Sequence, residues 1–172
     1  MSGGQRWGVV VLCWAALIAV APALVTNAVG SRRHGQIFPL RGPHWTRGPV
    51  GEFGAPRSGG RTHEGFDYMA PCGTKLVSAR EGTVLKRTYD PVLDGNYVII
   101  HARGLGRNYW YSHLRKPAIV HVGDFVRTGQ RIGAVGKTGN ARTVGCHLHF
   151  EMHVRGKPVD PEPALRRWDS FS

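Results

Sequence analysis

The apolar segments that follow Val25 are short and interrupted by glycine, which restricts this chain to folds with many turns. The 172 residues include 24 glycines and 11 prolines, and no long amphipathic helix is apparent beyond that point. Glycine and proline disfavour helix interiors but are common between short strands. We therefore expect an all-β fold, in one domain of ordinary size.

Strand signals recur between these turns. Runs rich in β-branched and aromatic residues predict strands at Thr74–Ser78, Gly82–Arg87, Tyr97–Ala102, Tyr109–Leu114, Ile119–Val122, Phe125–Val126, Arg131–Val135 and His147–Val154. The run GDFVRTGQRIG at 123–133 resembles the hairpins of lipoyl and biotinyl carrier domains, which implies a compact antiparallel β-sandwich or hybrid barrel. A carrier function is disfavoured, because no lysine sits beside a methionine at the expected hairpin tip. Pro163–Trp168 predicts at most one helical turn.

Two segments far apart in the sequence concentrate metal-binding side chains: HEGFD at 63–67 and CHLHFE at 146–151. Imidazole nitrogens with a single carboxylate are a typical catalytic zinc set, in which three protein ligands leave one position for water or substrate. A structural zinc site would more often be closed by cysteines. Metal-assisted hydrolysis is the leading interpretation.

Strand geometry limits how these side chains can meet. In an extended strand His147, His149 and Glu151 share one face, because side chains alternate with a period of two. His63 and Asp67 would also share a face, but four strand steps would hold them roughly 13 Å apart, too far for one metal. The backbone must therefore bulge or turn between them, and Gly65 is placed to allow this through its wider range of backbone angles.

The order of three motifs resembles a known family. H-x-x-x-D at 63–67, YSHL at 111–114 and HLHFE at 147–151 are similar to the lysostaphin and LytM type of zinc endopeptidase, over about residues 50–161. The resemblance implies one Zn²⁺ per chain and cleavage of peptide bonds in peptidoglycan stem peptides or cross-bridges. It also implies a central sheet that carries the zinc site, and an entry strand at Val50–Gly54. By resemblance the zinc ligands are His63, Asp67 and His149, and the residues that flank the metal-bound water are His113 and His147.

Within that assignment, His147 is the expected general base and His113 the orienting or oxyanion-stabilising residue, although the two roles could be exchanged. Glu151 is either an outer partner that fixes a histidine tautomer or simply part of the strand. The other histidines are expected to be ordinary surface or core residues: His34, His44, His101, His121 and His153.

Cys72 and Cys146 lie directly beyond the two metal motifs, so a metal that joins the motifs would bring the two sulfurs together. In an exported protein this predicts a Cys72–Cys146 disulfide. Alternatives are a zinc-bound Cys146 or two free thiols. Zinc binding is disfavoured, because Cys146 would face away from His147 and His149.

The N-terminus indicates export. Trp7–Val25 is an almost unbroken apolar run, and small residues follow it at passable cleavage sites. Residues 1–29 are therefore predicted to be a signal peptide or an uncleaved membrane anchor. Residues 30–48 form a basic linker, in which Phe38–Leu40 could already pack on the domain. Residues 49–165 are the catalytic domain, and residues 166–172 a C-terminal tail.

A formal charge of +12 favours retention near anionic wall polymers. Nucleic acid is not expected as a partner, since the basic residues are scattered and no binding motif is visible. We expect a protein that is secreted, held in the cell wall, or anchored in the membrane facing the envelope. The main alternative is a catalytically silent scaffold or activator of other wall hydrolases, because some members of the family have lost their zinc ligands.

Overall fold

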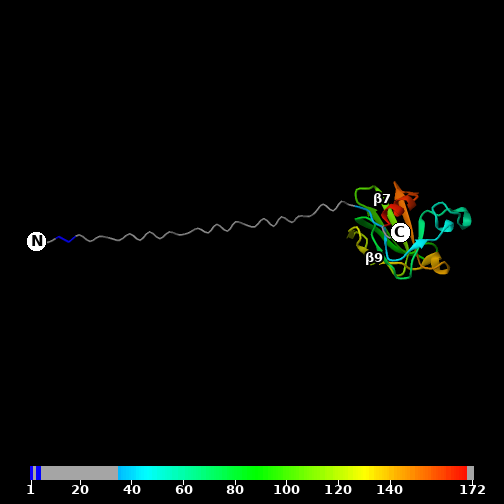
Figure 1. Cartoon of the computed structure of the whole chain (residues 1–172), viewed down its shortest axis with the longest axis horizontal. Helices are drawn as coiled ribbons and strands as arrows, with labels where there is room; N and C mark the ends of the chain where they lie inside the picture. The colour runs from blue at the N-terminus through cyan, green and yellow to red at the C-terminus, as the bar shows by residue number, and fades with distance from the viewer. Residues whose placement is uncertain (2, 5–34, 170–172) are drawn as a thin grey trace. The chain divides into compact units, whose positions relative to one another are not determined.

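The computed structural model describes residues 1, 3–4 and 35–169, so the apolar run of the predicted signal or anchor segment lies outside the described residues. Two antiparallel sheets and one short helix make up the folded part (Figure 1). The all-β expectation is confirmed. In the described part of the chain, no helix is both long enough and apolar enough to cross a membrane.

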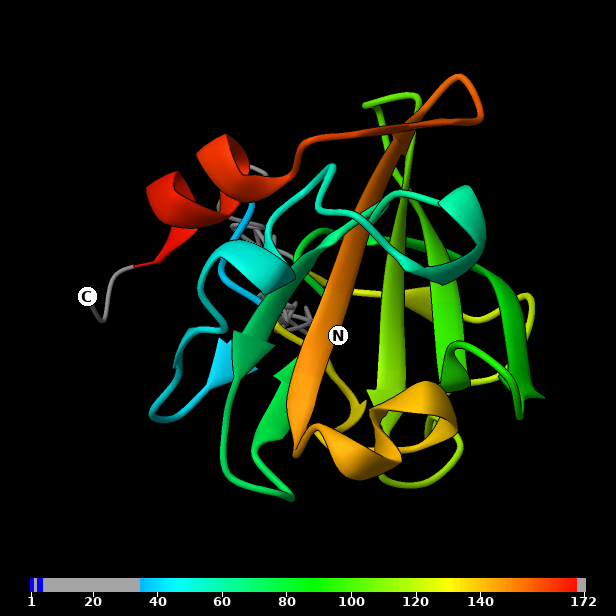
Figure 2. The same cartoon turned by 90° about the vertical axis from the view of Figure 1, so that its right-hand side faces the viewer.

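The large sheet has eight strands, and every pairing in it is antiparallel. Its order is β2-β3-β10-β7-β6-β5-β8, and β11 adds to the free end of β10. The bounds are β2 Trp45–Thr46, β3 Phe66–Met69, β5 Gly82–Asp90, β6 Gly95–Ala102, β7 Arg107–Leu114, β8 Phe125–Val126, β10 His147–Val154 and β11 Lys157–Val159. Strand β10 therefore lies inside the sheet, between β3 and β7, as Figure 2 shows in orange.

The small sheet has the order β1-β4-β9, with β1 at Leu40–Arg41, β4 at Lys75–Val77 and β9 at Arg131–Ala134. Side chains from both sheets form one hydrophobic core. Along β10 the core side chains are Leu148, Phe150 and Met152, which alternate with the predicted site residues. This alternation gives β10 one apolar face and one polar face.

The folded domain includes residues at both ends that were expected to lie outside it or to be less regular. Phe38 and Leu40 are fully buried in the core, so the middle of the predicted linker at residues 30–48 already packs on the domain. Helix α1, Glu162–Trp168, is longer than the single turn expected, and its Trp168 ring lies edge-on to Tyr109, with centroids 5.9 Å apart. The domain limits themselves stay a prediction.

Two expected strands are absent from the described structure. Val50–Gly54 forms the end of a 3₁₀ turn, η1 (Pro49–Gly51), followed by further turns. Gly48 and Gly54 have positive φ angles, which break an extended conformation on both sides. Ile119–Val122 is a bend rather than a strand, and both end residues are about 60% exposed. Apolar β-branched residues suggested a strand at this position, but only one backbone hydrogen bond, from Ile119 to Ile132, reaches β9.

Candidate metal centre and cleft

Three predicted ligand residues converge on one point of the large sheet. Asp67 in β3 and His149 in β10 are directly opposite each other, and His63 precedes β3. The Nε2 atom of His63 lies 2.8 Å from Nδ1 of His149 and 3.1 Å from Oδ1 of Asp67. The Nδ1 atom of His149 lies 2.9 Å from the same Asp67 oxygen. The three donor atoms therefore form a tight triangle between neighbouring strands.

A bend at Gly65 brings His63 and Asp67 together, as the spacing argument required. The reason for glycine differs from the expected one, because Gly65 is not among the residues with positive φ. A Cβ atom at this position would lie 2.5 Å from the Phe150 carbonyl oxygen and 2.7 Å from Cε1 of His149. Glycine is therefore needed here for close approach to β10, not for its range of backbone angles.

Each histidine of the triangle is oriented by a second hydrogen bond. Nδ1–H of His63 donates to the carbonyl oxygen of Glu52 at 2.8 Å, which leaves its Nε2 facing the triangle. Nε2–H of His149 donates to a carboxylate oxygen of Glu151 at 2.8 Å. Carbonyl and carboxylate partners of this kind fix the tautomer and ring orientation of metal-binding histidines. Asp67 is held through its other oxygen by Arg47, at 2.9 Å.

The electrostatics of the cluster favour an ionised Asp67. Burial alone would raise the pKa of Asp67, but hydrogen bonds from His149 and His63 hold it well below its usual range. Burial would likewise lower the pKa of His149, but its bonds to Asp67 and Glu151 raise it to about 10. Without metal, a proton on His149 compensates the buried carboxylates. A divalent cation would compensate the same charges.

The donor set also fits a metal by chemistry and spacing. Zinc bonds to imidazole nitrogen and carboxylate oxygen are about 2.0–2.2 Å, so tetrahedral ligand atoms lie about 3.3–3.5 Å apart. The observed separations of 2.8–3.1 Å are shorter than that spacing by about 0.2–0.7 Å. Two neutral nitrogens and one carboxylate oxygen are ligands that zinc takes in catalytic sites.

A bulge in β7 turns His113 into the same cleft. Tyr111 points into the core, so strict alternation would send His113 there too. Between the pairs Asn96–Leu114 and Val98–Tyr111, two residues of β7 oppose one residue of β6. His113 also has a φ of 61°, in the left-handed region that costs energy for a residue with a Cβ. The bulge re-aims this side chain, which is a common use of bulges near active sites.

His113 and His147 are held in the same tautomer. Nδ1–H of His113 donates to the Thr138 carbonyl at 2.9 Å, and Nδ1–H of His147 donates to the Gly145 carbonyl at 3.0 Å. Each ring therefore keeps a lone pair on Nε2. Burial lowers the pKa of His113 to about 3 and also lowers that of His147, so both rings are neutral at pH 7. Their centroids are 4.6 Å apart.

These five residues line one cleft of about 650 Å³. Its walls are the face of the large sheet and two loops that contain the 3₁₀ turns η2 (Ser58–Gly60) and η3 (Gly139–Thr143). Figure 2 shows η3 at the lower end of β10 and η2 in the upper right of the view. The cleft therefore lies between the two loops and includes the triangle of donor atoms.

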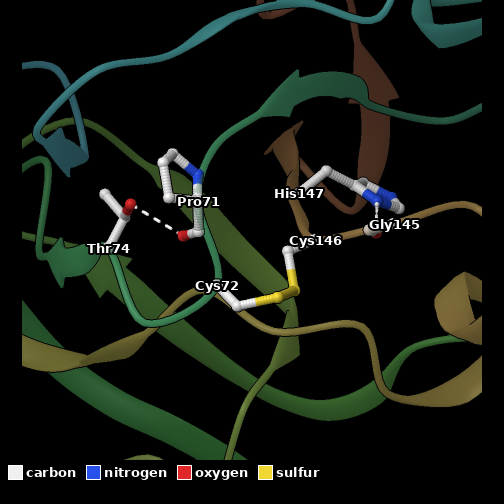
Figure 3. The surroundings of a disulfide bond; sticks show 6 residues. All are labelled: Pro71, Cys72, Thr74, Gly145, Cys146 and His147. Carbon is white, nitrogen blue, oxygen red and sulfur yellow. Dashed lines mark hydrogen bonds between the residues drawn. A yellow bond between two sulfur atoms is a disulfide. The ribbon is translucent and has the colours of Figure 1, made fainter.

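The Cys72–Cys146 disulfide is present and anchors the cleft from outside (Figure 3). It joins the turn after β3 to the residue before β10, and it closes a separation of 74 residues. Cys146 precedes His147, whose ring is turned away from the sulfurs in Figure 3 and bonds to Gly145. The predicted pairing is confirmed, and the alternatives of a zinc-bound Cys146 or free thiols are wrong.

Sequence reasoning missed several residues of the cleft. Asp94 lies close enough to His149 and Glu151 for their ligand atoms to fall within 4.8 Å of one another, and it lines the cleft. The only sequence signal there is an Asp-Gly turn. Trp110 and the arginines Arg47, Arg57 and Arg61 also line the cleft, and no sequence spacing relates them to the metal motifs.

The remaining described histidines do not line the cleft. His44 stacks on Phe38 with centroids 4.3 Å apart, and His101 and His121 are exposed. His153 donates from Nε2 to Glu151 at 2.6 Å and stacks on Trp110. Glu151 thus connects His149 to His153, and these bonds lower its pKa to about 2 against the opposing effect of burial. His34 lies outside the described residues.

Comparison with known proteins agrees with this geometry. The model of peptidase family M23 matches residues 61–161, which contain all five residues of the cleft described above. The chain belongs to peptidase family M23. The catalytic domain of lysostaphin from Staphylococcus simulans has a similar structure, with a TM-score of 0.61 and 30% identity, covering 67% of this chain and 89% of that one.

Two further similar proteins come from Vibrio cholerae. The peptidoglycan DD-endopeptidase ShyA of Vibrio cholerae is 42% identical over 100 residues, which are 57% of this chain and 22% of that protein. A zinc-containing peptidase from Vibrio cholerae has a TM-score of 0.63 and 33% identity, covering 74% of this chain and 39% of that one. The match extends over only about a fifth of the length of the first curated relatives.

Proposed function

We propose that this protein is a zinc-dependent endopeptidase that hydrolyses peptide bonds in peptidoglycan. The observation that carries the proposal is the triangle of donor atoms from His63, Asp67 and His149, with two neutral histidines beside it in one cleft. Three ligands leave a coordination position open, as a hydrolytic zinc site requires. Membership of family M23 supports the same reaction.

In this proposal His63, Asp67 and His149 hold one Zn²⁺ per chain. When bound, zinc polarises the scissile carbonyl and makes water acidic enough to act as a nucleophile near neutral pH. Glu151 orients His149 through its Nε2–H, and Arg47 orients Asp67 through Oδ2. Both contacts reduce the number of arrangements that the ligands can adopt before the metal binds.

His147 acts as the general base, and His113 orients the reacting groups or stabilises the oxyanion. The Nε2 lone pair of each ring can accept a proton, because Nδ1–H is committed to a backbone carbonyl. Once protonated, the same nitrogen becomes a donor, which can stabilise developing negative charge or protonate the leaving amine. The two roles can be exchanged between the rings, since their hydrogen bonds are of the same kind.

The proposed substrate is a stem peptide or cross-bridge of peptidoglycan, and the proposed place of action is the cell envelope. The naming of ShyA as a peptidoglycan DD-endopeptidase supports the substrate, and the apolar run at residues 7–25 supports export. We propose residues 1–29 as signal or anchor, 30–48 as linker, 49–165 as catalytic domain and 166–172 as tail. The charge of +12 supports retention by anionic wall polymers.

The test is release of muropeptides from purified peptidoglycan by the full chain, with zinc, with chelator, and as the His147→Ala variant. We expect new amine termini that disappear with chelator and in the variant, and their masses identify the bond that is cut. Intact peptidoglycan of several wall types, bound by a folded and zinc-loaded protein, would instead support the scaffold or activator role.

A further inference from the structure

Three arginines gather at one end of the cleft, and two of them lie close to one carboxylate. The guanidinium of Arg47 lies 2.9 Å from Oδ2 of Asp67, and that of Arg57 lies 3.9 Å from the same oxygen. Arg61 lines the cleft as well, and within residues 35–169 its guanidinium has no hydrogen bond or ion pair. The negative charge of Asp67 is also needed to balance the charge of a metal ion in the proposed site. It therefore does not neutralise the three arginines, and this end of the cleft carries an excess of positive charge.

The loop that carries two of these arginines has a defined shape. We call residues Pro56–Thr62 the η2 arch. Its ends form an antiparallel bridge, and the amide of Arg57 donates to the carbonyl of Arg61 at 2.9 Å. Gly59 and Gly60 turn the chain at the tip with φ of 72° each. Arg57 and Arg61 therefore stand opposite each other at the base of the arch, directly before His63.

Arg57 is placed like a binding group rather than a solvated surface charge. Its side chain is 24% exposed. Arginine side chains are charged at neutral pH. Glu64 also lines the cleft, but it forms no ion pair with these arginines in the described residues.

The opposite end of the cleft has the reverse charge. Asp94 and Glu151 lie there with Trp110, towards β6 and β7, whereas the arginines lie towards β2 and β3. The metal-binding triangle is between the two ends. A peptide with a carboxylate near its scissile bond would be attracted at the arginine end and repelled at the acidic end, so the charges impose one direction on the bound chain.

We infer that Arg57 and Arg61 form a carboxylate-binding subsite that selects peptides with a free carboxylate beside the scissile bond. Guanidinium groups match carboxylates in shape and donate two parallel hydrogen bonds. The inference rests on the proposed endopeptidase function and specifies its substrate class. Bridges made only of glycine carry no such carboxylate within the chain, and the subsite disfavours them.

The test uses two synthetic cross-linked stem-peptide dimers. They are identical except that the residue on the amine side of the scissile bond carries a free α-carboxylate in one and a carboxamide in the other. Full-length, zinc-loaded protein should cleave the carboxylate form with roughly ten-fold higher kcat/KM, mainly through KM. In the double variant Arg57→Gln/Arg61→Gln this preference should disappear. The two dimers are compared at equal zinc loading, because Arg57 lies 3.9 Å from the proposed ligand Asp67.

Two further variants separate recognition from general charge. Arg127→Gln removes an equal charge at an exposed position that does not line the cleft, and it should keep the preference. The single variant Arg61→Lys, which keeps the charge, should retain part of the preference for the carboxylate dimer. A double variant that loses activity equally on both dimers would overturn the subsite and indicate general attraction of anionic substrates. So would a wild-type enzyme that cleaves both dimers equally.

Measuring the affinity of the two dimers tests the subsite even if the protein does not cleave peptidoglycan. The affinity of both dimers for zinc-loaded His147→Ala protein is measured by calorimetry, with and without Arg57→Gln/Arg61→Gln. Tighter binding of the carboxylate form that depends on the arginines would support the subsite even without turnover. Equal affinities would overturn the subsite, whether or not peptidoglycan is cleaved.

Discussion

Strands β10 and β7 lie side by side and both present histidines to the cleft, but they do so in different ways. His147 and His149 reach it by the ordinary alternation of β10, whose other face is the apolar core. His113 reaches the cleft only because β7 contains a bulge, at which His113 itself has a φ of 61°. A regular strand can position site residues without backbone strain, whereas the neighbouring strand must accept strain to add one more.

The largest expected effect comes from β10. Changing His149→Ala removes the nitrogen that contacts both other ligands, so zinc content should fall to background and cleavage by roughly a thousand-fold or more. Metal analysis and muropeptide release measure both. His101→Ala is the matched control, because His101 is exposed on β6 and does not line the cleft. If His149→Ala retains stoichiometric zinc, the ligand assignment is wrong.

The second prediction concerns the disulfide that precedes β10. Replacing Cys72 and Cys146 by serine removes a cross-link over 74 residues, and the chain-entropy argument predicts a loss of about 4 kcal/mol in the free energy of unfolding. Urea unfolding of the oxidised protein and the double variant measures it. An unchanged midpoint would mean that β10 is held by its sheet neighbours alone.

The third prediction tests how closely the chain before β3 approaches β10. Gly65→Ala places a Cβ 2.5 Å from the Phe150 carbonyl and 2.7 Å from Cε1 of His149. Overpacking of this kind costs about 1–3 kcal/mol and should displace His149, so zinc affinity should fall by about ten-fold or more. Competition with a chelator of known affinity measures this. Normal affinity with normal stability would show that the approach is looser than the structure has it.

The smallest effect separates the two strands most directly. The His113→Gly protein should have a free energy of unfolding about 1 kcal/mol higher than the His113→Ala protein, because a left-handed backbone favours glycine. At His147 the order should reverse, since glycine weakens a regular strand by about 0.5–1 kcal/mol. Urea unfolding of the four variants gives both differences. The same order at both positions would contradict the strain assigned to β7.

Much of this site followed from local sequence, because strand periodicity is a local property. The shared face of His147, His149 and Glu151 and the need for a bend at Gly65 both follow from the geometry of an extended chain. The strands were located from runs of β-branched and aromatic residues. Ile119–Val122 had suitable residues but lacked a continuous partner, and a strand requires pairing as well as propensity. Val50–Gly54 was expected from the family resemblance, and turns at its glycines replace the strand.

By itself the sequence determined the fold class, the metal-binding residue types and the pairing of Cys72 with Cys146. Only the tertiary structure decided that a bulge turns His113 away from the core, and that Asp94 and three arginines give the cleft two oppositely charged ends. Alternation along a strand is set by the neighbouring residues of the chain. Bulges and cleft charges depend on which strands lie together, and that is decided by contacts between residues far apart in the sequence.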